Sequence, residues 1–485
     1  MTKKLVLMKK LHIIFTLLFG VAVLLFFGLA YPHHLHYQEQ YQLFLFDSNY
    51  AWEIVRLPGG IADLLGRFCT QFFLFAWVGA AIIALLLMAV QLLTLRLSLF
   101  TLHSSLFTLY GLTFVPSFLL WLFLLDEHAL LGGVWAVLLT LLALWLFVNL
   151  PKGWTRRIVI IVAIPILYYM VGPNWTGSHY YRYPTVTPYL LYAAWLTAII
   201  LPLFLSVKRK VKSEKNLARQ TSAVPLGLKQ ERRQQIFHFS FFTFTFIVMM
   251  TLVWKNANFK AEKVMQYDFM ACHQQWNRIL ETVNAEKPNN QIGVTVQNLA
   301  LAMHGQLVNH LFDYNQNGIA GLLPDVQSDA TSPMPTAEAF YQLGMVYVAQ
   351  RTVFEAQEAI LDFQKSGRCY KRLAQTNLII GSYEVARKYL MALQKTLFYR
   401  DWANETLPLL GNEEAIAKHP EYGRLRQMAY GEDFYFSDHV TPEMLESLCF
   451  SNPDNHLAYQ YLMAYYILTG DRESYAKLLL QMQKQ

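Results

Sequence analysis

Four carboxylates stand where they could do chemistry at a membrane surface. Glu39 and Asp47 lie in the long connection after the first apolar run, and Asp126 and Glu127 directly follow a later run. A carboxylate in a cleft open to lipid could act as a general base, or it could hold a divalent cation beside a lipid phosphate. Acidic side chains also serve purely structural roles at helix ends. The sequence leaves both interpretations open for all four residues.

Metal-binding patterns in the chain are incomplete. His33, His34 and His36 precede Glu39, but adjacent histidines rarely converge on one ion and their spacing fits no standard zinc pattern. The run 313–318 resembles the start of an EF-hand loop, but Pro324 stands where the bidentate glutamate belongs. We therefore predict no cofactor. A divalent cation belongs only to the catalytic interpretation of the four acids.

Several classes of function are disfavoured by what the sequence lacks. The four cysteines, Cys69, Cys272, Cys369 and Cys449, contain no closely spaced pair, which argues against zinc ribbons and thioredoxin-like chemistry. There is no glycine-rich phosphate loop, nucleophile elbow or HExxH motif. No apolar run carries a charged residue near its middle, which argues against ion-coupled transport. Whether the protein is an enzyme stays open.

The elements that must position the four acids are apolar runs of about the length that crosses a bilayer. The chain has 485 residues, 54% of them hydrophobic, and a mean hydropathy of +0.25. We predict that residues 1–254 form a transmembrane domain with a long first outer loop, 31–69. Whether the first run is cleaved as a signal peptide stays open. The seven predicted spans are Leu11–Ala30, Thr70–Leu92, Ser104–Leu125, Ala129–Leu150, Arg157–Val171, Thr187–Ser206 and Ile236–Trp254.

Charge predicts how these spans are oriented. Residues 1–254 carry 20 Lys/Arg and 8 Asp/Glu, a net of +12, whereas residues 255–485 carry 20 and 25, a net of −5. With the N-terminus in the cytoplasm, 17 of the first 20 basic residues lie on inner connections, nine of them in the loop 207–235. This pattern predicts an inner (cytoplasmic) membrane protein whose C-terminal domain is periplasmic or otherwise extracytoplasmic. The positive excess flanks the spans, so it does not indicate nucleic acid binding.

Within the first outer loop, the sequence predicts a turn followed by a helix. Pro58-Gly59-Gly60 is a turn signal, and the pattern from Ile61 onward is that of an amphipathic helix that leads into the second span. Asp63 and Arg67 lie four residues apart on this helix, so we expect them to form an ion pair.

Residues 255–485 have the pattern of an acidic helical-repeat domain. Small and large residues in 337–365 and 373–386 are spaced as in tetratricopeptide repeats, a third unit at 462–479 matches more weakly, and an earlier one surrounds 299–305. In such repeats the small residues let paired helices approach, and the large ones fill the seam. The predicted fold is therefore all-α: about seven transmembrane helices followed by a degenerate, tetratricopeptide-like domain. Such a domain commonly binds a protein or an envelope polymer.

The transmembrane part resembles the C-type glycosyltransferases, which use a lipid-phosphate-linked sugar. They share a seven-span module with a long, helix-containing first outer loop that holds a catalytic acid. The resemblance implies that Glu39 or Asp47, together with Asp126 and Glu127, occupies the corresponding positions. It covers residues 1–254 only, and the chain lacks both an Asp-x-Asp pair in the loop and the later spans of that superfamily.

Over nearly its full length the chain resembles an uncharacterised family of bacterial multispan membrane proteins. The segments that carry the resemblance are HYQEQYQLFLF (36–46), PGG (58–60), NLAL (298–301), GLLP (321–324) and LFYRDWA (397–403). This resemblance implies the architecture but no activity. Two hypotheses for function follow. The first is a membrane-anchored repeat domain that binds a protein or envelope component. The alternative is a glycosyltransferase-like enzyme with Glu39 or Asp47 as the base.

Overall fold

The structure is a computed structural model, and it divides the chain into two compact units. It describes residues 2–100, 111–151, 153–172, 189–200, 228–325, 333–360, 364–430 and 441–483. The first unit contains Met1–Glu39 and Asp47–Phe259, and the second contains Gln40–Phe46 and Lys260–Gln485. The division after Phe259 lies close to the predicted boundary after Trp254. The assignment of Gln40–Phe46 to the second unit differs from the prediction, which kept the whole first loop with the transmembrane part.

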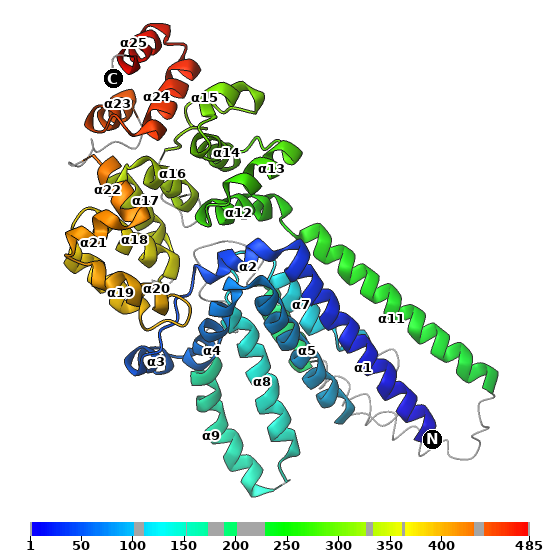
Figure 1. Cartoon of the computed structure of the whole chain (residues 1–485). Helices are drawn as coiled ribbons and strands as arrows, with labels where there is room; N and C mark the ends of the chain where they lie inside the picture. Colours follow the sequence, from blue (N-terminus) through cyan, green and yellow to red (C-terminus); the bar gives the residue numbers. More distant parts are fainter. Residues whose placement is uncertain are drawn as a thin grey trace, which may run out of the picture. The chain divides into compact units, whose positions relative to one another are not determined.

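Helices form the regular structure throughout the described ranges (Figure 1). Among these residues there is no β-strand, and a single isolated bridge joins Asn317 and Ile319. The all-α prediction is therefore confirmed. A helix satisfies its own backbone hydrogen bonds, which is why it suits apolar sequences that enter a bilayer.

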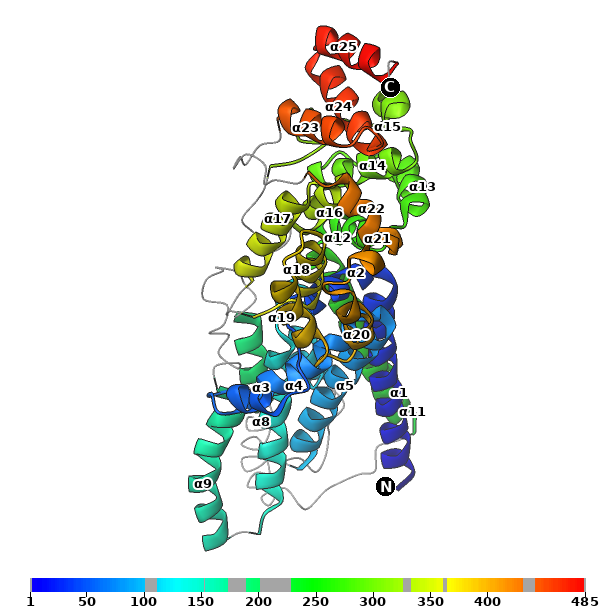
Figure 2. The ribbon, with the colours of Figure 1, turned by 60° about the vertical axis from the view of Figure 1, so that its left-hand side comes forward.

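Long apolar helices dominate the first unit. α1 packs against α5, and α8 packs against both α5 and α9, as the two views of the ribbon show (Figures 1 and 2). A π-helical turn, Phe26–Ala30, extends α1. The long helices are α1 (Thr2–Leu25), α5 (Ala76–Phe100), α8 (Leu131–Asn149), α9 (Trp154–Val171) and α11 (Leu228–Asn256).

Three described helices are long and apolar enough to cross a membrane, and they support membrane association. They cover His12–Ala30, Ala76–Ser98 and Leu131–Asn149. The predicted count of seven spans is not confirmed. Two further apolar helical stretches, Ile161–Val171 within α9 and Tyr189–Ile200, are shorter than a span. The predicted run Ser104–Leu125 contains α7, Val115–Phe123, and the predicted run Ile236–Trp254 lies within α11. The orientation stays a prediction, because most of the basic loop 207–235 lies outside the described residues.

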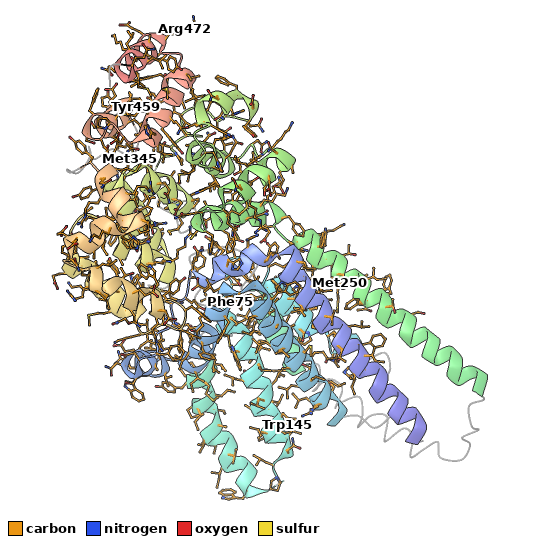
Figure 3. The ribbon with its side chains drawn as sticks, in the orientation of Figure 1. Phe75, Trp145, Met250, Met345, Tyr459 and Arg472 are labelled. Carbon is orange, nitrogen blue, oxygen red and sulfur yellow. The ribbon has the colours of Figure 1, made fainter. Side chains whose placement is uncertain are left out.

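An aromatic cluster holds the long helices of the first unit together. Trp121 of α7 is fully buried and packs edge-to-face against Phe19 and Phe26, with ring centroids 5.7 and 5.6 Å away. Phe114 packs against Phe19 in the same geometry at 5.5 Å. Figure 3 shows side chains of this unit, including Met250, which packs against the same buried cluster. Aromatic pairs of this kind add about 0.5–1.5 kcal/mol each beyond the area they bury.

Three short helices, α2 (Pro32–Glu39), α3 (Ser48–Val55) and α4 (Gly60–Thr70), occupy the first loop. Gly59 adopts φ 83°, the left-handed conformation that the predicted turn needs before α4. The predicted ion pair on α4 is confirmed, with Arg67 Nη2 2.7 Å from Asp63 Oδ2. Gly66 is buried where α4 meets α8. Only glycine fits this contact, because a Cβ at this position would lie 2.5 Å from the backbone nitrogen of Gly132.

The second unit is built from short antiparallel helices. Hairpins are present at the predicted positions, and their turns contain glycines with positive φ at Gly305, Gly344, Gly381 and Gly470. Met345 and Tyr459, labelled in Figure 3, belong to the main buried cluster of this unit. The more specific tetratricopeptide assignment is not confirmed. The helices are α12 (Phe259–Cys272), α13 (Trp276–Glu286), α14 (Gln291–Met303), α15 (Leu307–His310), α16 (Pro333–Leu343), α17 (Val346–Ala359), α18 (Gly367–Ile379), α19 (Tyr383–Leu393), α20 (Arg400–Thr406), α21 (Glu413–Lys418), α22 (Pro420–Met428), α23 (Pro442–Ser451), α24 (His456–Thr469) and α25 (Arg472–Met482).

The contact at Gly66 predicts how the first unit responds to one added methyl group. We expect Gly66→Ala to lower the melting temperature in detergent, because the new Cβ meets the backbone of α8 and the helices must separate. Overpacking of this kind costs about 1–3 kcal/mol. The matched control is Gly133→Ala in α8, whose Cβ would meet only the ends of side chains, chiefly the terminal methyl groups of Leu191. Equal melting temperatures for the two variants would contradict the prediction.

Candidate functional site

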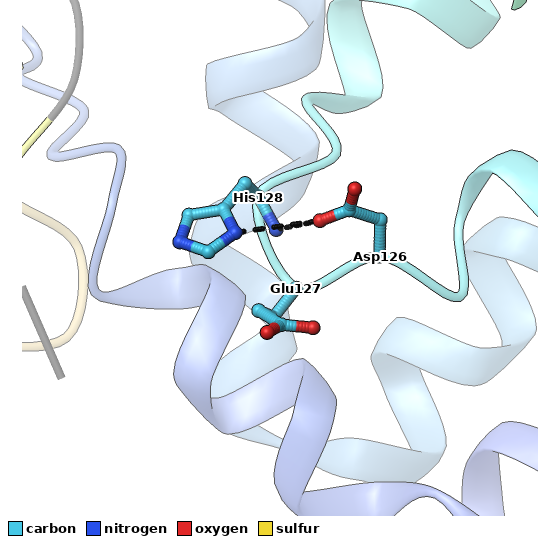
Figure 4. A group of neighbouring side chains, drawn as sticks. All are labelled: Asp126, Glu127 and His128. Atoms are coloured by element: carbon cyan, nitrogen blue, oxygen red, sulfur yellow. Dashed lines mark hydrogen bonds and ion pairs between the residues drawn. The ribbon is translucent and has the colours of Figure 1, made fainter. Parts of the chain in front are cut away.

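Asp126, Glu127 and His128 form a compact group in the turn between α7 and α8 (Figure 4). One potential ligand atom from each side chain lies within 4.8 Å of the other two. The Oδ1 atom of Asp126 accepts a hydrogen bond from the backbone N–H of His128 at 2.9 Å, and it lies 3.4 Å from the Nδ1 atom of the imidazole. All three residues are half-buried. Two of the predicted acids thus form a group with His128, which follows them directly in the sequence.

Electrostatics in this turn favour a charged imidazole. Burial lowers the pKa of His128, but the hydrogen bond with Asp126 and the negative charges of Asp126 and Glu127 outweigh it and raise the pKa above its ordinary value. A protonated imidazole has no free lone pair for a metal. The raised pKa therefore favours an ion pair with Asp126 over a cation site in this group.

Side chains of the first loop fix the backbone of the same turn. The Nε2–H group of His34 donates to the carbonyl of Leu124 at 2.9 Å, and the amide of Gln38 donates to the carbonyls of Asp126 and Ala129, both at 3.2 Å. His34 and Gln38 lie four residues apart, so they occupy one face of α2. Burial lowers the pKa of His34 to about 4, which keeps the imidazole neutral. α2 therefore lies against the turn that carries Asp126 and Glu127.

The two acids of the first loop have different surroundings. Glu39 ends α2 and is 7% exposed, but it is not a member of the group around Asp126. Asp47 caps α3, since its Oδ1 atom accepts hydrogen bonds from the backbone N–H groups of Asn49 at 2.9 Å and Tyr50 at 3.1 Å. The structure explains Asp47 by its role as a helix cap. A catalytic role for any of the four acids stays a prediction.

The geometry around His128 predicts a pH-dependent contribution to stability. Its pKa is raised on folding, so the ion pair stabilises the native state fully at acidic pH and loses this effect as the pH rises through the raised pKa. We expect His128→Gln to lower the melting temperature in detergent at about pH 5.5 and to have little effect at about pH 9. The control is His273→Gln, since His273 is exposed on the second unit. An equal loss from His128→Gln at both pH values would contradict the prediction.

A buried set of charged residues surrounds α18 in the second unit, and we call it the α18 charge cluster. Arg368 forms a bidentate ion pair with Asp268 of α12, with Nη1–Oδ2 and Nη2–Oδ1 distances of 2.5 and 2.8 Å. Their side chains are only 11% and 10% exposed. One turn later, Arg372 pairs with Glu338 of α16. The members are Asp268, Glu338, Arg368, Lys371, Arg372, Glu421 and Arg424.

Neutral side chains connect these charges to one another. The guanidinium of Arg372 stacks on the ring of Tyr341, 3.7 Å from its centroid, and the Tyr341 hydroxyl donates to Glu421 at 2.9 Å. The amide of Gln342 donates to Glu338 at 3.0 Å and accepts from Arg424 at 2.8 Å. Burial first, and then the nearby Glu421, raise the pKa of Tyr341, so the phenol stays protonated. Tyr341 and Gln342 therefore link Arg372, Glu338, Glu421 and Arg424 into one polar network.

Sequence reasoning missed the α18 charge cluster because its acids lie far from its arginines along the chain. The one local signal is the spacing of Arg368, Lys371 and Arg372, which places three cations on neighbouring positions of one helix. No pairing within α18 satisfies them. Such a helix face needs acids from elsewhere in the fold, but the sequence does not reveal which ones.

The irregular segment Gln40–Phe46 also belongs to the second unit. The backbone N–H of Leu43 donates to the carbonyl of Lys365 at 2.7 Å, and that of Phe46 donates to the carbonyl of Lys395 at 2.6 Å. The side chain of Leu43 is buried in an apolar cluster with residues of α18, α19 and α20. Arg368 Nη1 lies 3.4 Å from the Gln40 side-chain oxygen. The helices therefore hold a non-helical piece of chain through both its backbone and its side chains.

The pairing of Arg368 with Asp268 predicts a non-additive response to mutation. We expect Asp268→Leu to lower the free energy of unfolding of the second unit by about 3–5 kcal/mol, because it leaves a buried guanidinium without its partner. The double variant Asp268→Leu, Arg368→Met removes both charges and should recover most of this loss. Chemical unfolding of the single and double variants forms a double-mutant cycle. Additive losses would show that the pair is not coupled.

Comparisons with known proteins identify one family. Its model, described as a family of unknown function (DUF6057), matches residues 7–176 and 173–485. No curated protein and no solved structure matches the chain. Because the matches cover nearly the whole sequence, the chain belongs to this family.

Proposed function

We propose that this member of the DUF6057 family is a membrane-anchored binding protein. Its apolar helices hold the second unit at the membrane, and the helical hairpins of that unit bind an irregular segment of a partner protein. This proposal develops the prediction of a repeat domain that binds a protein or envelope component. It takes a protein as the partner because the helices already hold a peptide segment.

The proposal rests on the contacts by which the segment Gln40–Phe46 binds to the helices of the second unit. This segment satisfies two of its backbone N–H groups with carbonyls that lie outside helices, at Lys365 and Lys395. Backbone contacts of this kind accept many sequences, whereas side-chain pockets select among them. Leu43 supplies the side-chain contact in this case, among Ala374, Leu390, Leu393 and Ala403. A surface with both features is suited to recognising a non-helical peptide.

Exposed apolar residues extend this surface. Met391 of α19 is 54% exposed, and Val385 on the same helix is 41% exposed. Leu397, in the connection before α20, is 41% exposed. Scattered apolar residues are normal on protein surfaces, but these three lie on elements that flank the held segment. They are the residues that we expect a partner to cover.

The positive-inside pattern supports an extracytoplasmic location for this binding unit. The N-terminal stretch contains Lys3, Lys4, Lys9 and Lys10 before the first apolar run, and the loop 207–235 is strongly basic. The proposed partner is therefore a periplasmic or otherwise extracytoplasmic protein.

A glycosyltransferase-like activity has less support. Asp47, one of the two candidate bases, uses its carboxylate to cap α3. Asp126 is paired with His128, and Glu39 is not a member of their group. Our proposal therefore assigns these acids structural roles and places the function in the second unit.

Photo-crosslinking in intact membranes tests the proposal. A photoreactive phenylalanine analogue at Met391 is expected to capture a defined protein, because a partner segment would pass beside α19. The control places the same analogue at Phe312, which is 72% exposed on the second unit but lies after α15. The proposal fails if Met391 yields no adduct, or if both positions yield the same adducts.

A further inference from the structure

Three cations of the α18 charge cluster have hydrogen-bonding capacity that the described residues do not use. The Nη1 atom of Arg372 is buried and makes no hydrogen bond to any described residue. Lys371 forms no ion pair with a described carboxylate, and its ammonium group lies 5.1 Å from the centroid of the Trp402 ring. Arg424 contacts neutral atoms, the side-chain oxygen of Gln342 and the sulfur of Met428. Buried donors without partners are rare in native proteins and call for an explanation.

We propose that the α18 charge cluster is a binding site for a carboxylate group, held by Lys371, Arg372 and Arg424. This inference does not depend on the contacts of Gln40–Phe46 with the second unit or on the identity of a protein partner. It assigns a chemical class of ligand to charged residues of α18 and α22.

Charge balance favours a ligand with a single negative charge. The cluster contains four cations, Arg368, Lys371, Arg372 and Arg424, and three carboxylates, Asp268, Glu338 and Glu421. Its formal charge is therefore +1. One carboxylate neutralises this charge, whereas a phosphate dianion would exceed it. Neutrality matters because an uncompensated buried charge costs several kcal/mol.

The guanidinium of Arg372 is already oriented for such a ligand. Glu338 holds its Nη2 atom, and the ring of Tyr341 supports its face at 3.7 Å. These contacts fix the plane of the guanidinium and leave Nη1 as the donor without a partner. A carboxylate bound there would need little side-chain ordering, because preorganised donors lose less entropy on binding.

The pKa of Lys371 can report whether a carboxylate is bound. Burial lowers the pKa of its ammonium group, and the nearby Arg372 lowers it further, against the opposing effects of Cys272, Glu421 and Glu338. A carboxylate bound beside Lys371 favours the charged form and should therefore raise this pKa again.

The test is a titration of the full chain in detergent after reductive ¹³C-methylation of its lysines. The Lys371→Arg variant identifies the Lys371 resonance by its disappearance. The probes are acetate and glucuronate as two sources of a carboxylate, inorganic phosphate, and glucose as a neutral control, all at constant ionic strength. We expect a saturable shift of the Lys371 resonance and a raised pKa with acetate, glucuronate or both. Which of them binds more tightly distinguishes a simple carboxylate from an acidic sugar.

Two further variants keep the proposal falsifiable. Arg424→Met should weaken carboxylate binding by about tenfold, which corresponds to about 1.4 kcal/mol, and Arg424→Lys should retain more of it because the charge is kept. The exposed Lys388 of α19 is the internal reference and should not respond. The proposal is overturned if no probe shifts Lys371, if Lys388 shifts equally, or if only phosphate produces the response. The first outcome would show that water alone occupies the spare donors.

Discussion

Two buried arginine–carboxylate pairs on α18 are the interaction on which the second unit depends. Taking a guanidinium and a carboxylate out of water costs several kcal/mol for each ion, so the pairs stabilise the fold only when their geometry is close. Arg368 with Asp268, and Arg372 with Glu338, meet this requirement across three helices. A shift in the register of α12 or α16 would leave a buried charge without its partner. The pairs therefore limit how these helices can pack, while apolar burial supplies most of the driving force.

In the first unit, neutral side chains make the buried polar contacts between helices. Gln91 of α5 donates to Thr113 at 3.2 Å and accepts from Thr16 of α1 at 3.0 Å, and its amide nitrogen lies 3.0 Å from the Nε2 atom of His12. These four residues satisfy one another among apolar helices, where an unpaired polar group would be costly. In the turn after α7, the neutral side chains of His34 and Gln38 likewise form hydrogen bonds with backbone carbonyls. The first unit thus needs no buried ion pair between its long helices among the described residues.

The sequence predicted features that depend on local pattern. Apolar length and period indicated the all-α class, and the four-residue spacing of Asp63 and Arg67 predicted their ion pair. Features that depend on distant partners were not predictable. Asp47 is a separate case, because its cap contacts are local, at residues two and three positions later, and the sequence left this structural role open beside a catalytic one. The sequence placed Gln40–Phe46 in the first outer loop of the transmembrane domain. Its assignment to the second unit depends on carbonyls more than 300 residues away at Lys365 and Lys395.

The position of Gln40–Phe46 also bears on how a partner could bind. The segment is part of the same chain, so it occupies its surface at a high effective concentration, in the millimolar range for short flexible connections. A partner that offered only a similar apolar peptide would compete poorly. A partner that also carried a carboxylate would gain contacts at the α18 charge cluster, and Arg368 already links that cluster to Gln40. The two proposed sites share α18, so a single ligand with an apolar segment and one acidic group could engage both. Charge would then select the partner, and the apolar surface would hold it.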